Sequence, residues 1–276
     1  MTALVALLAS MIVGSADFLF GLAARRSGPL SVPLVAQICG LLVLGVSLVV
    51  VDAPDVRSGD LAWGAISGVA TSVGYVLFLA AMSIGKISVV APVTAATGAA
   101  FTALYGLGFD EAPGLLSGAG IVVAIAAIAL VCSEGNAEAT TPPKAVWFAL
   151  LSGGFVGLLF VSLAFTSTEA GMWPLVASRA VTLPLLVAIN LGIARGIRFN
   201  RSDFAGTAAA GMMEMLASIL ILWALRRGPV AIAGVFGSLY PASTVFLAWV
   251  FIGERLRSIQ KAGVCLALAA AVLAAV

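Results

Sequence analysis

Long apolar runs broken by short polar stretches make up most of the chain. A helix needs about 20 mostly apolar residues to cross the roughly 30 Å hydrocarbon core of a bilayer. Runs of that length, bounded by Gly, Pro or charged residues, occur ten times along the 276 residues. They cover residues 3–24, 30–51, 61–84, 87–108, 113–132, 145–167, 172–194, 204–226, 229–252 and 257–276. The pattern predicts an all-α polytopic membrane protein with ten transmembrane helices.

The composition agrees with a chain surrounded by lipid. Hydrophobic residues make up 62% of it and charged residues only 9%, whereas soluble domains carry roughly 25% charged residues. A water-exposed surface with so little charge would not be solvated, so we expect the bilayer to be the main solvent. The net charge of +2 is too small to indicate a nucleic-acid partner.

The residue types give little support to catalysis or to a cofactor. The chain has no histidine, which removes Ser/His and Cys/His nucleophile pairs and His-ligated metal sites. Cys39, Cys132 and Cys265 are far apart and match neither a metal spacing nor a disulfide framework. No Gly-rich phosphate loop with Lys is present, so ATP is not expected as the energy source. We therefore expect no enzyme, no cofactor and no metal.

Sliding the sequence against itself by 143 residues aligns rare residue types without a gap. Asp60 meets Asp203 and Glu111 meets Glu254, although the chain has only 12 acidic residues. Glycines coincide in the pairs Gly14/Gly157, Gly28/Gly171, Gly68/Gly211, Gly85/Gly228 and Gly120/Gly263. We interpret residues 1–134 and 145–276 as two five-helix repeats joined by a polar linker at 135–144. Because five is odd, the second repeat enters the membrane from the opposite side, and such inverted repeats are typical of secondary transporters.

Basic residues are unequally divided between the two sides of the predicted bundle. One side holds Arg25, Arg26, Lys86, Lys144, Arg195, Arg198, Arg201, Arg255, Arg257 and Lys261. The other side holds Arg57, Arg226 and Arg227. Cytoplasmic loops carry the excess of Lys and Arg, so we expect both termini in the periplasm of a bacterial cell. The first apolar run has no basic residues before it, and we interpret it as a retained helix rather than a cleaved signal.

Three charged residues lie well inside predicted spans: Asp17, Arg179 and Glu214. A charge near the bilayer centre costs roughly 2.5–3.5 kcal/mol on insertion scales, which makes each of them a functional candidate. Asp17 shares a helix face with Ser10 and Gly14, and small-residue faces meet other helices rather than lipid. Desolvation favours the protonated form of such an acid, so Asp17 is a candidate proton carrier. The alternative is a packing acid that is hydrogen-bonded to a neighbouring backbone.

Glu214 lies one turn before Ser218 and is a second candidate for proton or substrate binding. Its counterpart in the first repeat is Thr71, four residues from Tyr75, so the two helices are expected to line one cavity from two sides. Arg179, in the seventh predicted helix, has three open roles. It can pair with Glu214, bind an anionic group of a substrate, or extend toward the membrane interface.

Aromatic and proline residues supply further candidates. Tyr75, Trp223 and Tyr240 offer stacking surfaces for a substrate, although packing alone also explains aromatic residues in a span. Pro92 and Pro241 lie inside the fourth and ninth predicted helices, where proline removes an N–H and disrupts the helix. Irregular backbone at that depth is tolerated only against protein or a cavity, so both prolines are candidates for helix breaks and gating.

Five stretches carry a likeness to a known family. They are Gly14–Arg26 (GSADFLFGLAARR), Gly85–Val93 (GKISVVAPV), Trp173–Arg179 (WPLVASR), Arg227–Ala242 (RGPVAIAGVFGSLYPA) and Gly253–Gly263 (GERLRSIQKAG). The last contains a Gly-Glu turn, and its counterpart Asp110–Gly120 (DEAPGLLSGAG) lacks the glycine before the acid. The chain resembles the EamA-type members of the drug/metabolite transporter superfamily over nearly its whole length. This resemblance implies ten helices in two inverted halves and export or exchange of small metabolites. Its better-known members have cytoplasmic termini, on the opposite side from that predicted by the basic residues.

The combined prediction is a secondary transporter of a small metabolite or drug-like solute in the cytoplasmic membrane, driven by an ion or proton gradient or by exchange. The alternative is a sensor or binding subunit that does not move its ligand. A channel is less supported because no ring of polar residues forms a filter, and an intramembrane protease lacks its catalytic residues. Few fixed charges favour a small amphipathic or zwitterionic substrate over a polyanion. The expected partners are this substrate and the lipid bilayer, for a monomer or an oligomer.

Overall fold

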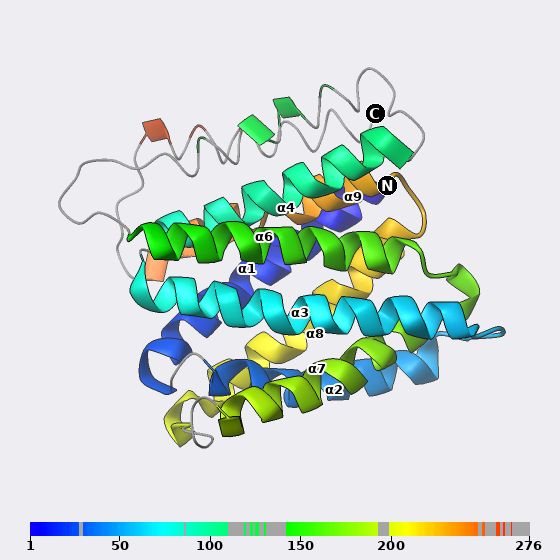
Figure 1. The fold of residues 1–276 in the computed structure, drawn as a ribbon, viewed down its shortest axis with the longest axis horizontal. Helices are drawn as coiled ribbons and strands as arrows, with labels where there is room; N and C mark the ends of the chain where they lie inside the picture. Colours follow the sequence, from blue (N-terminus) through cyan, green and yellow to red (C-terminus); the bar gives the residue numbers. More distant parts are fainter. Residues whose placement is uncertain are drawn as a thin grey trace.

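The computed structural model describes residues 1–27, 30–85, 87–109, 142–192 and 199–247, with isolated positions between 119 and 130 and between 250 and 266. All regular secondary structure in these residues is helical (Figure 1). The helices are α1 (Thr2–Ser27), α2 (Ser31–Val50), α3 (Ser58–Ile84), α4 (Ile87–Phe109), α6 (Pro143–Ala164), α7 (Trp173–Gly192), α8 (Phe204–Leu225), α9 (Val230–Gly237) and α10 (Tyr240–Leu247). Short 3₁₀ helices, η1 (Thr168–Ala170) and η2 (Arg201–Asp203), precede α7 and α8.

The described helices match a multi-pass membrane protein. Six of them are long and apolar enough to cross a bilayer: α1, α2, α3, α6, α7, and α8 together with η2. Seven predicted segments agree with α1 to α4 and α6 to α8 within three residues at each end. Two others, 113–132 and 257–276, lie outside the described residues apart from the isolated positions, and Glu111 and Glu254 are also outside them. The count of ten helices therefore stays a prediction.

The helices of the two halves interleave. In Figure 1, α3 lies between α6 and α7, and it packs against both of them; α8 packs in the same way against α1 and α2. α4 packs against α6, as α9 and α10 pack against α1. α2 also contacts α7 directly, and α4 contacts α9. Each of these contacts has a counterpart when first-half helices are exchanged for second-half helices, whereas described helices of the same half contact each other much less.

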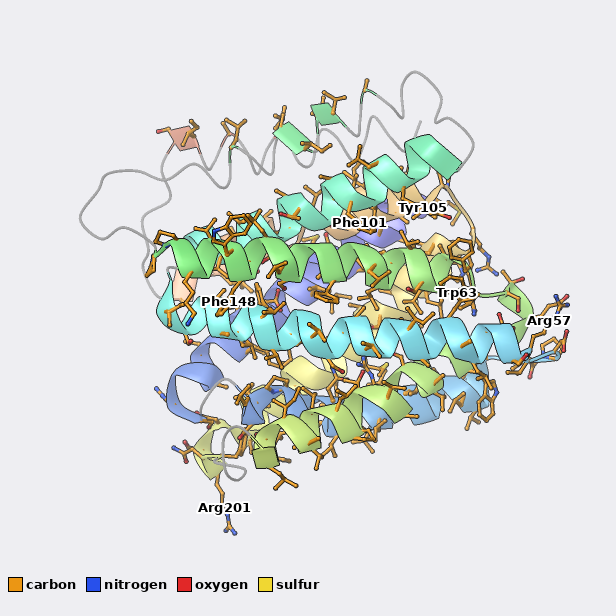
Figure 2. The ribbon with its side chains drawn as sticks, in the orientation of Figure 1. Arg57, Trp63, Phe101, Tyr105, Phe148 and Arg201 are labelled. Carbon is orange, nitrogen blue, oxygen red and sulfur yellow. The ribbon has the colours of Figure 1, made fainter. Side chains whose placement is uncertain are left out.

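Matching helices of the two halves run in opposite directions. Ser27, the last residue of α1, lies beside Asp203 at the start of α8. Ser167, just after α6, lies beside Asp60 at the start of α3. Figure 2 shows Arg57 and Arg201 at opposite ends of the bundle. We call these the Arg57 end and the Ser27 end: α1 finishes at the Ser27 end, and α6 finishes at the Arg57 end.

Matched glycines let helices of opposite halves touch backbone to backbone. Gly68 on α3 lies against the backbone of Ser178 on α7, and Gly211 on α8 lies against the backbone of Ala36 on α2. A Cβ at either glycine would overlap the carbonyl oxygen of its neighbour. Gly68 and Gly211 are 143 residues apart, so the register found in the sequence coincides with equivalent packing points. Small residues permit this close approach in membrane bundles.

The ninth predicted span, 229–252, contains a break. α9 ends at Gly237, Ser238 and Leu239 form a turn, and α10 starts at Tyr240 with Pro241 as its second residue. Proline has no N–H and favours the first turn of a helix, which explains why a new helix starts here. α4, in contrast, is helical from Ile87 to Phe109 across position 92, and the side chain of Pro92 lies outside the described residues.

Candidate functional site

A cavity of about 130 Å³ lies in the middle of the bundle, between the two halves. Helices α1, α3, α4, α6, α7 and α8 line it, together with the break between α9 and α10. Its polar and charged lining residues are Asp17, Thr71, Tyr75, Thr94, Ser152, Ser178, Arg179, Glu214, Ser218 and Tyr240. Aliphatic and aromatic side chains form the rest of the wall. Such a mixture of apolar wall and few polar groups is typical of small-molecule sites.

Arg179 and Glu214 form an ion pair at one wall of this cavity. The Arg179 Nη2 donates to both carboxylate oxygens of Glu214, at 3.1 Å each. The Ser218 hydroxyl donates to Oε1 at 3.3 Å, and the Gln37 amide donates to Oε2 at 3.5 Å. Arg179 is 4% exposed and Glu214 is 8% exposed. Of the three roles that the sequence allows for Arg179, the structure shows the pair with Glu214.

Asp17 lies on α1 and lines the same cavity, but it has no such partner. It is 5% exposed, and it accepts no hydrogen bond from any residue that the structure describes. The alternative of a packing acid bonded to a neighbouring backbone therefore finds no donor in this part of the chain. A buried carboxyl group is costly in its charged form when no donor faces it, which keeps Asp17 a candidate for exchangeable binding.

The predicted aromatic candidates divide between the cavity and another region. Tyr75 lines the cavity and packs edge-on against Phe20, with ring centroids 6.3 Å apart. Tyr240 lines it at the start of α10, and its hydroxyl donates to the Ala91 carbonyl at 3.4 Å. Trp223 is not among the lining residues, and its ring lies 4.5 Å from the Arg227 guanidinium. Pro241 belongs to the break beside the cavity.

Gln37 on α2 is a site residue that the sequence analysis missed. It is 2% exposed and reaches Glu214 from the other half of the chain. Its Oε1 is buried and has no hydrogen-bond partner among the described residues, and the same holds for the Arg179 Nε. A search for charges inside apolar runs passes over a neutral amide. The signal that could have identified Gln37 was a polar side chain within a 20-residue apolar helix.

The matched acids Asp60 and Asp203 join the halves at the two ends of the bundle. At the Arg57 end, the carboxylate of Asp60 accepts the backbone N–H of Ser167 at 2.6 Å and its hydroxyl at 3.1 Å. At the Ser27 end, the Ser27 hydroxyl donates to Asp203 at 2.7 Å. Each acid stands at the start of the third helix of its half and accepts a hydrogen bond from a serine at, or just after, the end of the other half's first helix.

Arg226 holds the loop after α6 from within its own half at the Arg57 end. Its Nη1 donates to the Gly171 carbonyl at 2.7 Å, and its Nε donates to the Thr166 hydroxyl at 3.1 Å. Burial lowers the pKa of this guanidinium to about 10, and the nearby Asp60 carboxylate opposes that shift. The group is still protonated at neutral pH. The loop between α6 and α7 is thus held by both Asp60 and Arg226.

The sequence profile of the EamA-like transporter family matches residues 1–133 and again residues 143–276. The chain belongs to the EamA-like transporter family. The match to two halves confirms the resemblance to EamA-type proteins and identifies a family of membrane transporters rather than enzymes. No curated protein matches the chain. A solved structure, described only as "Crystal structure of protein", covers 99% of this chain and 96% of its own with a TM-score of 0.73. At 16% identity, this likeness shows the fold alone.

Proposed function

We propose that this EamA-like protein is a secondary transporter that carries a small solute across the cytoplasmic membrane by exposing the central cavity to each side in turn. The observation that carries the proposal is the carboxyl group of Asp17, which has no hydrogen-bond donor among the described residues and lies in a cavity between two interleaved halves. A sensor or binding subunit would need no exchangeable charge at that place. A proton-coupled carrier requires one.

The packing of the halves supports alternating access. Two inverted repeats, which we propose for residues 1–134 and 145–276, provide two nearly equivalent arrangements, in which one end opens while the other closes. Asp60 and Asp203 link the halves at opposite ends through equivalent contacts. Breaking the Asp60 contact would open the Arg57 end, and breaking the Asp203 contact would open the Ser27 end. The break at Pro241 places irregular backbone against the cavity, where such backbone is tolerated.

The charged residues of the site take different roles in this proposal. Glu214 is held in place because Arg179, Ser218 and Gln37 all donate to it. Asp17 has no donor in the part of the chain that the structure describes, so in this proposal it is the group that exchanges a proton during the cycle. Proton binding on one side and release on the other then couples solute movement to the proton gradient.

Two experiments in sequence test the proposal. Metabolites are first compared between cells that lack the protein and cells that overproduce it, and the solute that changes is then loaded into proteoliposomes. Wild-type protein should move it when a pH gradient is imposed. Asp17→Asn should keep the protein folded and abolish pH-driven flux, while Asp52→Asn, the same change at an exposed loop acid, should leave flux unchanged. Normal gradient-driven transport by Asp17→Asn would reduce Asp17 to a packing residue.

A further inference from the structure

We infer that the cavity takes a monovalent organic cation: a small amine with an apolar or aromatic body, whose ammonium group binds Asp17 in place of a proton. This inference rests on the proposed transport function and adds the chemical class of the solute.

The charges that line the cavity determine this class. They are two carboxyl groups, Asp17 and Glu214, and one guanidinium, Arg179. The guanidinium is already neutralised by Glu214 through two contacts of 3.1 Å. With Asp17 ionised, the lining described here carries one net negative charge. A cation restores neutrality, whereas an anion would place like charges together in a medium of low dielectric constant.

The uncharged walls fit the rest of such a molecule. Tyr75, Phe78, Phe155, Phe160 and Tyr240 line the cavity around these charges. Aromatic faces attract cations through their quadrupole, most strongly when water is excluded, and they also pack against an apolar body. A polar body, such as a sugar, would leave its hydroxyl groups with few partners in this wall.

A zwitterion is less well matched than a simple amine. Its carboxylate would need a basic partner, and Arg179 is the basic residue in the described lining. Arg179 already forms an ion pair with Glu214, so a second carboxylate would leave two anions sharing one guanidinium. A neutral solute, in turn, would leave the proton on Asp17, so its binding would not exchange with that proton.

The exchange is balanced in protons and charge. The protonated carboxyl of Asp17 releases one proton as the ammonium group binds, so one cation replaces one cation in the cavity. The titratable or charged groups facing this exchange are Glu214 on α8, Arg179 on α7, Tyr75 on α3 and Tyr240 on α10. Because Arg179 holds Glu214, Asp17 is the group that exchanges.

Four probes that share a phenethyl skeleton test the class directly. They are 2-phenylethylamine (cation), 2-phenylethanol (neutral), 3-phenylpropionate (anion) and phenylalanine (zwitterion), titrated calorimetrically into the full chain in lipid nanodiscs. We expect the amine to bind at least tenfold more tightly than the other three. Its affinity should rise as the pH is raised, up to tenfold per pH unit, with release of close to one proton per amine.

Variants of Asp17 separate a binding role from a structural one. Asp17→Asn should lose the amine preference, Asp17→Glu should keep both the preference and the pH dependence, and Asp52→Asn should resemble the wild type. Asp17→Glu keeps the test decisive if Asp17→Asn fails to fold.

Three results would overturn the inference: amine binding no tighter than that of the alcohol, tighter binding of the propionate or phenylalanine, or amine affinity independent of pH. The proposed transport function fails separately. Proton-driven flux of a neutral or anionic solute would support the transport function and exclude the cation class. Specific amine binding with no flux of any solute would support the cation class and exclude the transport function.

Discussion

At the scale of single residues, the buried pair of Arg179 and Glu214 stands apart from the charges at the bundle ends. Each member is less than 10% exposed, so neither can rely on water when the other is removed. Attraction between two buried charges offsets their desolvation only while both are present and hydrogen-bonded. Arg57, by contrast, is exposed, and removing one of its ion pairs leaves a charge that water solvates.

We therefore predict a large difference between breaking and deleting this pair. Arg179→Leu should destabilise the protein by about 3–5 kcal/mol, because it leaves the Glu214 carboxylate buried without its cation. The double variant Arg179→Leu/Glu214→Leu should regain most of that loss. Thermal unfolding in detergent measures both effects.

Arg201→Leu is the matched control for that prediction. Arg201 is exposed, and Figure 2 shows it projecting from the Ser27 end of the bundle, so this change should have little effect on stability. A double variant as unstable as Arg179→Leu would mean that the two residues contribute independently and that the pair is not the stabilising unit.

Rarity explains which site residues could be predicted from the sequence. Asp17, Arg179 and Glu214 stand out because charged residues are costly in apolar runs, and all three line one cavity. A search for charged residues does not find Gln37, because burying a neutral amide costs less than burying a charge. Sequence alone could not exclude Trp223 from the site, because the position of an aromatic residue in a span does not show whether it faces a cavity or a neighbouring side chain.

At the scale of helices, the glycine contacts control how closely the halves approach. Gly211 on α8 meets the backbone of Ala36 on α2, and Gly206, on the same helix, has no atom within 4 Å of the position of an added Cβ. The two glycines thus offer a matched test, because the same substitution on one helix meets backbone at one position and open space at the other.

We predict that Gly211→Ala destabilises the protein by about 1–3 kcal/mol through forced separation of α2 and α8. Gly206→Ala should be neutral or slightly stabilising, since alanine is the better helix former. Thermal unfolding midpoints of the two variants provide the comparison. Equal midpoints would show that α2 moves aside without cost and that close contact is not required.

Helix positions were the most predictable level of the fold. Apolar length and flanking polar residues located seven helices within three residues at each end, because lipid imposes a nearly fixed helix length. The interruption at Ser238–Leu239 was signalled by Pro241, but the similar Pro92 lies within a helix that is continuous in the structure. Loss of one N–H near the start of a helix does not decide whether the helix ends, since packing around it also matters.

At the scale of the whole molecule, two contacts between the halves lie at opposite ends. The Asp60–Ser167 contact joins the halves at the Arg57 end, and the Ser27–Asp203 contact joins them at the Ser27 end. If transport requires these ends to open alternately, a permanent bond at either one should stop the cycle while leaving the fold intact.

We predict that disulfides at these contacts block flux. In a variant with Cys39, Cys132 and Cys265 replaced by alanine, the pair Asp60→Cys/Ser167→Cys should lose transport on oxidation and regain it on reduction. Flux of the solute identified in cells provides the measurement.

The pair Ser27→Cys/Asp203→Cys should behave in the same way at the opposite end, and the four single-cysteine variants serve as controls. Undiminished flux through a protein with a fully formed disulfide at either end would contradict alternating opening at that end.

Orientation in the membrane is predicted from the distribution of basic residues. Arg57 and Arg201 lie at opposite ends of the bundle, as expected for residues of the two sets of loops. A reporter fused after Val276 that is active only in the periplasm should therefore be active, because the more basic side stays in the cytoplasm. Activity of a cytoplasm-only reporter at the same position would show that the chain has the orientation of its better-known relatives.

The interleaving of the halves has a consequence for biogenesis. Among the described helices, α1 finds its main neighbours in α8, α9 and α10, and α3 finds its own in α6 and α7. When α1 to α4 leave the ribosome, these partners have not yet been synthesised. We therefore expect α1 to α4 to stay loosely associated in the bilayer at first. The helices of the two halves pack together only after α8 has been translated. A ribosome stalled after the first half would leave the described helices α1 to α4 without most of their packing partners, and quality-control proteases can recognise and remove such a product.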